Sequence, residues 1–103
     1  IAPDEILNKL REQIINELYN LEDTDIQDGI DISVCAVDTE KKTFQFAGAN
    51  NNALYIHNNE LREIKGDKMP VGRFDKIESF QLKEHEYTNG DVIYLYSDGF
   101  NPT

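Results

Sequence analysis

The sequence contains few cysteine, tryptophan and proline residues. Its 103 residues include one cysteine, no tryptophan and three prolines. A single cysteine excludes an intrachain disulfide framework and a cysteine-rich zinc site. Cys35 stands inside an apolar run, so we expect a buried, unreactive thiol, and this fits a reducing, cytoplasmic setting.

Long apolar runs are also missing, and no signal-peptide pattern opens the sequence. A membrane-spanning helix needs about 20 apolar residues, so we expect no direct membrane contact. Basic residues are scarce, with ten Lys and Arg against twenty Asp and Glu and a formal net charge of -10. Phosphate backbones repel such a surface, which argues against nucleic-acid binding. The acids either keep the chain soluble or, in part, collect divalent cations.

The residues that are present describe a globular chain, because 39% are hydrophobic and five Phe and five Tyr are among them. Residues 3–19 show the apolar spacing of an amphipathic helix. Pro3 suits the first helical position, and Asp4 and Glu5 complement the positive end of the helix dipole. We expect this helix to cover a sheet.

After a polar, acidic loop at residues 20–29, the apolar pattern changes to a period of two, which is typical of strands. Predicted strands span residues 30–37, 43–48, 54–57, 61–64, 77–83 and 92–96. Turns are expected near 39–42, 58–60 and 88–91, with a break at 49–52 and a long connection at 65–76. The strand at 92–96 is apolar at nearly every position, as in strands buried on both faces.

One helix followed by several antiparallel strands predicts an α+β fold, a layered sandwich of antiparallel β-sheets. A single helix leaves part of such a sandwich uncovered, and the sequence opens at Ile1 rather than at a methionine. We therefore expect residues 1–103 to be part of a larger domain whose fold is present only in part.

The last predicted strand leads into Ser97-Asp98-Gly99. An acid at the end of a buried strand places a carboxylate at the rim of the sheet, and the following glycine lets the backbone turn away from it. Mg²⁺ and Mn²⁺ prefer such oxygen ligands. The alternative is a simple turn, since Ser-Asp-Gly is a common turn sequence.

Several segments occur in one order: Asp28–Ile32, Phe46–Asn51, Leu54–Ile56, Glu63–Gly72 and Gly90–Phe100. Together they resemble the sporulation protein II E-like (SpoIIE) branch of the PPM-type protein phosphatases. The resemblance covers about residues 5–100 and is strongest at 28–72 and 90–100.

The resemblance implies a central β-sandwich flanked by helices, with two Mg²⁺ or Mn²⁺ ions at one end. The ions activate a water that removes phosphate from phosphoserine or phosphothreonine. Asp98 matches the metal-binding Asp of the family's Ser-Asp-Gly element, which makes it the catalytic residue and a metal ligand. Asp31 matches a polar position near the same centre and is the second candidate ligand, unless it pairs with a Lys or Arg instead.

Some of the family's pattern is missing. The family's earlier Asp, its metal-bridging Asp-Gly pair and its late Asp have no counterpart here, and Asp28-Gly29 lies on the wrong side of the helix to be that pair. One Asp cannot hold two metals, so this stretch alone is expected to be inactive. The alternatives are a non-catalytic PPM-like module for interaction or dimerisation, and an unrelated acidic binding domain.

The resemblance also implies partners: a phosphoprotein substrate such as an anti-anti-sigma-like regulator, and an upstream sensory or receiver domain in the same protein. A homodimer and a cytoplasmic location, with or without tethering through the sensor region, are consistent with it. His57 and His85 are interpreted as surface residues, and Asn50, Asn51 and Asn52 as turn residues. We also expect two breaks in the sequence, near 19–27 and after 100, at which residues of the original protein have been omitted.

Overall fold

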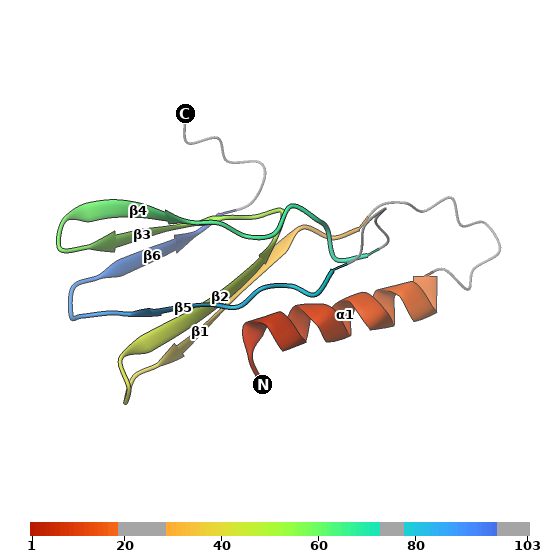
Figure 1. Ribbon diagram of the computed structural model, residues 1–103, viewed down its shortest axis with the longest axis horizontal. Coiled ribbons are helices and arrows are strands. Elements are labelled where there is room, and N and C mark those ends of the chain that lie inside the picture. Colours follow the sequence, from red (N-terminus) through yellow and green to blue (C-terminus); the bar gives the residue numbers. More distant parts are fainter. Residues whose placement is uncertain (19–28, 73–77, 97–103) are drawn as a thin grey trace.

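The computed structural model describes residues 1–18, 29–72 and 78–96. The elements follow in the order α1 (Pro3–Leu18), β1 (Ile32–Asp38), β2 (Thr43–Ala49), β3 (Ala53–His57), β4 (Glu60–Ile64), β5 (Lys83–Glu86) and β6 (Val92–Leu95). Figure 1 shows α1 lying along the sheet that contains β1 and β2, with the second sheet beyond it. The predicted chain breaks near 19–27 and after 100 lie outside the described residues.

Two antiparallel three-stranded sheets make up the sandwich, in the orders β1-β2-β5 and β4-β3-β6. The register of the first hairpin pairs Ile32 with Ala49 and Asp38 with Thr43, and that of the second pairs Ala53 with Ile64 and His57 with Glu60. Lys42, Asn58 and Asn59 take positive φ in the two connecting turns. Asparagine tolerates this conformation better than most residues, which fits the predicted turn at 58–60.

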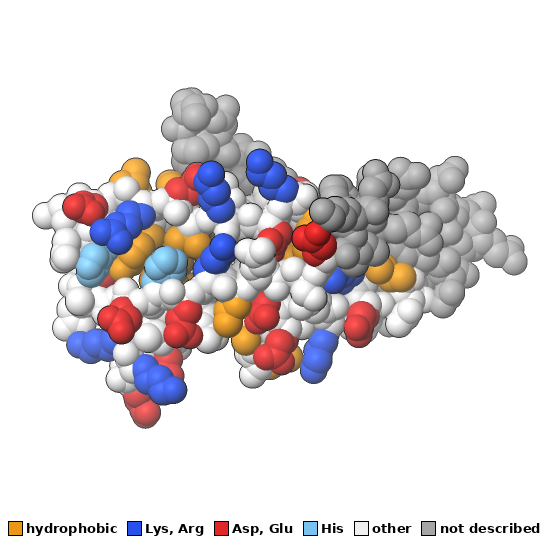
Figure 2. Space-filling model, in the orientation of Figure 1, with side chains coloured by type: hydrophobic (Ala, Val, Ile, Leu, Met, Phe, Trp, Pro, Cys, Tyr) orange, Lys and Arg blue, Asp and Glu red, His pale blue; other side chains and the backbone are white. Residues whose placement is uncertain are grey.

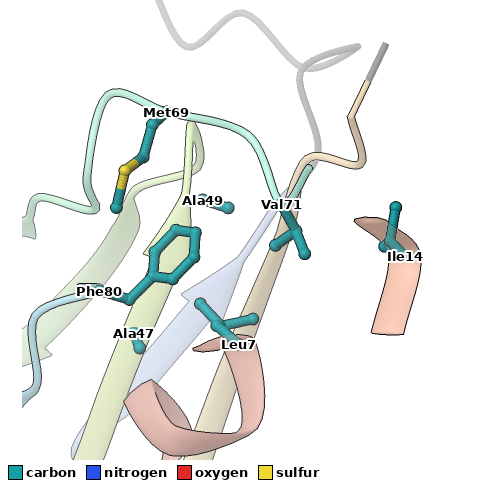
Figure 3. Packing of buried hydrophobic residues seen from close by; sticks show 7 residues of the cluster. All are labelled: Leu7, Ile14, Ala47, Ala49, Met69, Val71 and Phe80. Atoms are coloured by element: carbon teal, nitrogen blue, oxygen red, sulfur yellow. The ribbon is translucent and has the colours of Figure 1, made fainter. Parts of the chain in front are cut away.

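Strand β2 separates two hydrophobic clusters because its side chains alternate between the faces of its sheet. Ala47 and Ala49 face α1 and belong to a cluster with Leu7, Ile14, Met69, Val71 and Phe80. In Figure 3 the ring of Phe80 lies between Met69 and Leu7, beside the two alanines. Phe44 and Phe46 face the second sheet and pack with Ala53, Tyr55 and Ile64. The layers are therefore helix, sheet and sheet.

The predicted strand at 77–83 is wrong over residues 78–82, and β5 begins only at Lys83. The backbone of residues 78–82 forms hydrogen bonds with side chains from α1 and from the loop after β4, and not with a neighbouring strand. Asn8 Oδ1 accepts from the Phe80 N–H at 3.1 Å, and Asp67 Oδ2 accepts from the Gln81 N–H at 2.8 Å. Arg11 donates to the Glu78 carbonyl at 2.7 Å and lies 5.0 Å from the Phe80 ring centroid.

Strand β6 is also less buried than its apolar sequence predicted. Within the described residues it pairs only with β3, and Val92, Tyr94 and Leu95 are 41%, 53% and 46% exposed. Composition identifies a strand that can be buried on both faces, but burial depends on what packs against it. In the described part of the chain, β6 is an edge strand.

None of the helices in the described residues is long and apolar enough to cross a membrane. Cys35 is half-buried against the inter-sheet cluster. Burial raises the pKa of its thiol above the ordinary value, which disfavours the reactive thiolate and fits the predicted unreactive thiol.

Candidate functional site

One end of the sandwich holds Asp31, and the strand that precedes Asp98 in the sequence ends there. β1 begins there, directly after Asp31, opposite the end of β2 at Ala49. On the second sheet, Ala53 at the start of β3 pairs with both Ile64 and Leu95, the last residues of β4 and β6. Antiparallel register therefore brings the exit of β6 to the same end as Asp31. Asp98 follows three residues after Leu95 in the sequence and lies outside the described residues.

Asp31 is exposed and is held by an asparagine. Its Oδ1 accepts a hydrogen bond from Asn50 Nδ2 at 3.0 Å, and the backbone of Asn50 has a φ of 56°. Among the described residues, Asp31 pairs with no Lys or Arg within 4.0 Å, and Arg73 and Lys76 lie outside those residues. Asn50 has the predicted turn role, and it also orients Asp31, which the sequence did not reveal.

The loop after β4 is bound to the loop after β2 through backbone contacts. Asn50 N–H donates to the Asp67 carbonyl at 2.7 Å, and Asp67 N–H donates to the Gly48 carbonyl at 2.8 Å. Gly66 N–H donates to Asn52 Oδ1 at 2.9 Å. These bonds hold the backbone of Asn50, from which its side chain reaches Asp31.

Two glycines allow this close approach. A β-carbon on Gly66 would lie 2.1 Å from the carbonyl oxygen of Asn51, and one on Gly48 would lie 2.2 Å from the same atom. Real β-carbons do not approach a backbone oxygen so closely, so the loops pack in this way only because both residues lack a side chain.

A metal centre at this end would need ligands beyond those described. No group of three or more His, Cys, Asp or Glu side chains that could hold an ion occurs in residues 1–18, 29–72 and 78–96. Asp31 offers a carboxylate of the kind that Mg²⁺ and Mn²⁺ prefer, with one oxygen engaged by Asn50. The chemistry of this donor fits such an ion, but Asp31 can supply only part of the coordination.

A second polar cluster, which the sequence did not indicate, lies at the opposite end of the second sheet and centres on Asp91. Asp91 Oδ2 accepts from His57 Nδ1 at 2.6 Å, from the Tyr55 hydroxyl at 2.9 Å and from the Thr88 N–H at 2.9 Å. The Asp91 side chain is only 6% exposed and that of His57 23%. His57 is therefore not the freely solvated surface residue that the sequence predicted, because Asp91, which precedes β6 and lies 34 residues away in the sequence, binds its ring.

The donors around Asp91 favour its ionised form. Burial by itself raises the pKa of this carboxyl, but the hydrogen bonds from the Thr88 backbone, His57 and Tyr55 outweigh burial and lower it from 3.8 to about 2. Burial and the neighbouring Asp91 raise the pKa of the Tyr55 hydroxyl. That hydroxyl has one proton and two acceptors in reach, Asp91 and the Glu86 carbonyl at 3.0 Å, so it ties the start of β6 to the end of β5.

This cluster predicts a pH-dependent contribution to stability. The folded pKa of Asp91 lies below its ordinary value of 3.8, so its stabilisation is fully present above about pH 4 and is lost as pH falls toward 2. We expect Asp91→Asn to lower the urea midpoint of the full-length protein at pH 5, and the difference from wild type to shrink between about pH 4 and pH 2. The matched control is Glu40→Gln in the exposed β1–β2 turn. A difference that stays constant over this range would contradict the assignment.

His85 is exposed, as predicted. It is not free of the core, since its ring stacks on Phe44 with centroids 5.4 Å apart and an interplanar angle of 23°. Figure 2 shows both histidines of the chain beside hydrophobic side chains on one face, with acidic and basic side chains interspersed around them.

The comparisons with known proteins decide which family this fold belongs to. A family model described as stage II sporulation protein E (SpoIIE) matches residues 1–101. The chain belongs to the SpoIIE family. No curated protein sequence matches it.

A solved structure agrees with this assignment. The chain superimposes on the SiaA-PP2C domain of Pseudomonas aeruginosa with a TM-score of 0.80 and 25% sequence identity, covering 96% of this chain and 37% of that one. The predicted α+β sandwich is thereby confirmed as a PP2C-type (PPM) fold, present in part. This SpoIIE-family chain spans little more than a third of the length of that structure.

Proposed function

We propose that this chain is part of a metal-dependent protein phosphatase domain in bacterial signalling that removes phosphate from phosphoserine or phosphothreonine. The observation that carries the proposal is the SpoIIE family match on a sandwich in which β6 finishes at the end that holds Asp31. In the sequence, Ser97-Asp98-Gly99 follows shortly after that strand. The similarity to a PP2C domain supports it.

In this proposal Asp98 is the catalytic metal ligand. It follows Leu95 by three residues, so the covalent chain keeps it within about 11 Å of the strand end. Asp31 is the second candidate. Its Oδ1 accepts a hydrogen bond from Asn50, and its other carboxylate oxygen, Oδ2, is the proposed ligand atom. Two Mg²⁺ or Mn²⁺ ions, when bound, would supply an activated water for attack on the phosphoester. The remaining ligands come from outside the described residues.

The proposed substrate is a regulatory phosphoprotein of the anti-anti-sigma type, and the proposed input is a sensory or receiver domain in the same protein. A cytoplasmic location and a homodimer belong to the same proposal. The acidic balance of the chain, with a net charge of -10, favours protein over nucleic-acid partners.

Metal removal tests the proposed activity. We expect the full-length protein to hydrolyse p-nitrophenyl phosphate and a phosphoserine peptide with added Mn²⁺, to lose the activity with EDTA, and to regain it when Mn²⁺ is returned in excess. Hydrolysis that persists after thorough metal removal would count against the proposal, as would its absence on both substrates at every Mn²⁺ concentration.

A non-catalytic PPM-like module for interaction or dimerisation is the second candidate. The exposed apolar side chains of β6, among them Val92 and Tyr94, favour it because such residues are typical of contact surfaces. Metal-dependent turnover by the full-length protein would exclude it, whereas a stable complex without turnover would support it.

A further inference from the structure

Beside Asp31, the same end of the sandwich carries a polar groove of about 320 Å³. Its lining consists of Asn50, Asn52, Glu63, Lys65, Gly66, Asp67 and Lys68. The chain has seven lysines among its ten basic residues, and two of the seven line this groove.

Both lysines are exposed, and neither forms an ion pair within 4.0 Å in the described part of the chain. By contrast, Arg62 on the neighbouring strand pairs with Glu60 at 3.0 Å. An ammonium group without a fixed acidic partner keeps its charge available for an incoming anion.

The two acids of the groove differ in their availability. Asp67 Oδ2 accepts from the Gln81 N–H, which holds that carboxylate on the side of the 78–82 segment. Glu63 is exposed on β4 and forms no ion pair with Lys65 or Lys68 within 4.0 Å. The two lysines supply the positive charge of the groove, and the exposed Glu63 carboxylate offsets part of it.

The frame beneath the lysines is fixed in advance. The parallel bridge between Ala49 and Asp67 and the bond from Gly66 N–H to Asn52 hold the loop that carries both lysines. A binding surface on a preorganised backbone loses less entropy when it binds, so the groove suits a docking role.

We propose that Lys65 and Lys68 bind acidic side chains that flank the phosphorylated residue of a protein substrate. The inference rests on the proposed phosphatase function. In that function the phosphoryl group binds at the metal centre at this end, and the peptide residues next to the phosphorylated residue bind in the groove. Carboxylates beside the phosphorylated residue would otherwise be repelled by a chain of net charge -10, so the two lysines select for them.

The test compares three substrates of the full-length protein with Mn²⁺: a phosphoserine peptide with Asp and Glu on both sides, the same peptide with Asn and Gln there, and p-nitrophenyl phosphate. Exposed charge pairs each contribute modestly, so we expect two of them to make kcat/KM favour the acidic peptide by about tenfold. The variant K65Q/K68Q should lose this preference and keep its p-nitrophenyl phosphate activity. The control K9Q/K41Q removes the same charge from α1 and the β1–β2 turn and should retain the preference.

Two results would overturn the inference. One is an unchanged peptide preference in K65Q/K68Q. The other is an equal fall on all three substrates, which would place the lysines at the phosphoryl group. Fluorescence anisotropy with labelled, unphosphorylated versions of the two peptides gives a readout without turnover. Salt-sensitive binding of the acidic peptide that K65Q/K68Q loses supports the groove even if no hydrolysis occurs, and equal binding by wild type and variant rejects it.

Discussion

Asp98→Asn in the full-length protein is expected to lower kcat/KM for p-nitrophenyl phosphate by at least about 100-fold, because altering even the partners of a metal ligand costs about 10–100-fold. Asparagine keeps the size of the side chain but removes its charge, so the metal is bound more weakly. The loss should be partly reversed at high Mn²⁺. Steady-state kinetics over a Mn²⁺ titration measure both effects.

Two companion variants make this result specific. Glu40→Gln, in the exposed turn after β1, removes one negative charge at the opposite end of that strand and should leave kcat/KM unchanged. Asp31→Asn should raise the Mn²⁺ concentration needed for half-maximal activity if Asp31 is a ligand. An Asp98→Asn enzyme with wild-type kinetics would remove Asp98 from the metal centre and return Ser97-Asp98-Gly99 to the role of a turn.

Gly66→Ala is expected to destabilise the full-length protein by about 3 kcal/mol, at the upper end of the usual cost of overpacking. The added methyl group would lie 2.1 Å from the Asn51 carbonyl oxygen and 2.9 Å from that of Gly48. Both neighbours are backbone atoms of a paired loop, so they cannot rotate away as a side chain would. The loop that carries Lys65 and Lys68 would have to move, and chemical denaturation with intrinsic tyrosine fluorescence reports the cost.

The same substitution at Gly90 is the matched control. A β-carbon there has nothing within 4 Å, but the backbone has a φ of 93°, so the cost is conformational and amounts to about 1–2 kcal/mol. We therefore expect Gly90→Ala to be milder than Gly66→Ala. If Gly90→Ala lowered the free energy of unfolding as much as Gly66→Ala or more, the two loops would have to be farther apart than in the structure.

Local patterns predicted most of the secondary structure. The apolar spacing of residues 3–19 gave the helix, which the structure places at Pro3–Leu18. Alternation gave the hairpins at 30–48 and 54–64, which appear as β1–β2 and β3–β4 within two residues at each end. These elements depend on neighbours a few residues apart, and their periods can be read directly from the sequence.

The errors arose where distant residues decide the structure. Residues 78–82 alternate as a strand would, yet their backbone is hydrogen-bonded to the side chains of Asn8, Arg11 and Asp67. His57 looked like a surface residue because its partner Asp91 is remote in sequence. No periodic signal could have indicated either contact, because each joins segments that meet only after the chain has folded.

The site was predicted in part. The ordered segments that resemble the SpoIIE family identified the family, which the model match over residues 1–101 confirms. The metal-binding roles of Asp98 and Asp31 stay predictions, since Asp98 lies outside the described residues. Neither the bond from Asn50 to Asp31 nor the groove shared by Lys65 and Lys68 could be predicted from the sequence.

The sequence by itself determined most of the elements of this protein, its acidic composition and its membership of a phosphatase family, because periodicity, composition and motif order are local or additive properties. Only the tertiary structure decided which polar groups meet. Antiparallel register brings Asp31 to the exit of β6 and Asp91 to His57, and two glycines let the loops of Asn51 and Gly66 touch. These contacts join segments that are distant in the sequence, so they form only when the helix and both sheets have packed together. The same packing decides which charged side chains are paired and which remain exposed.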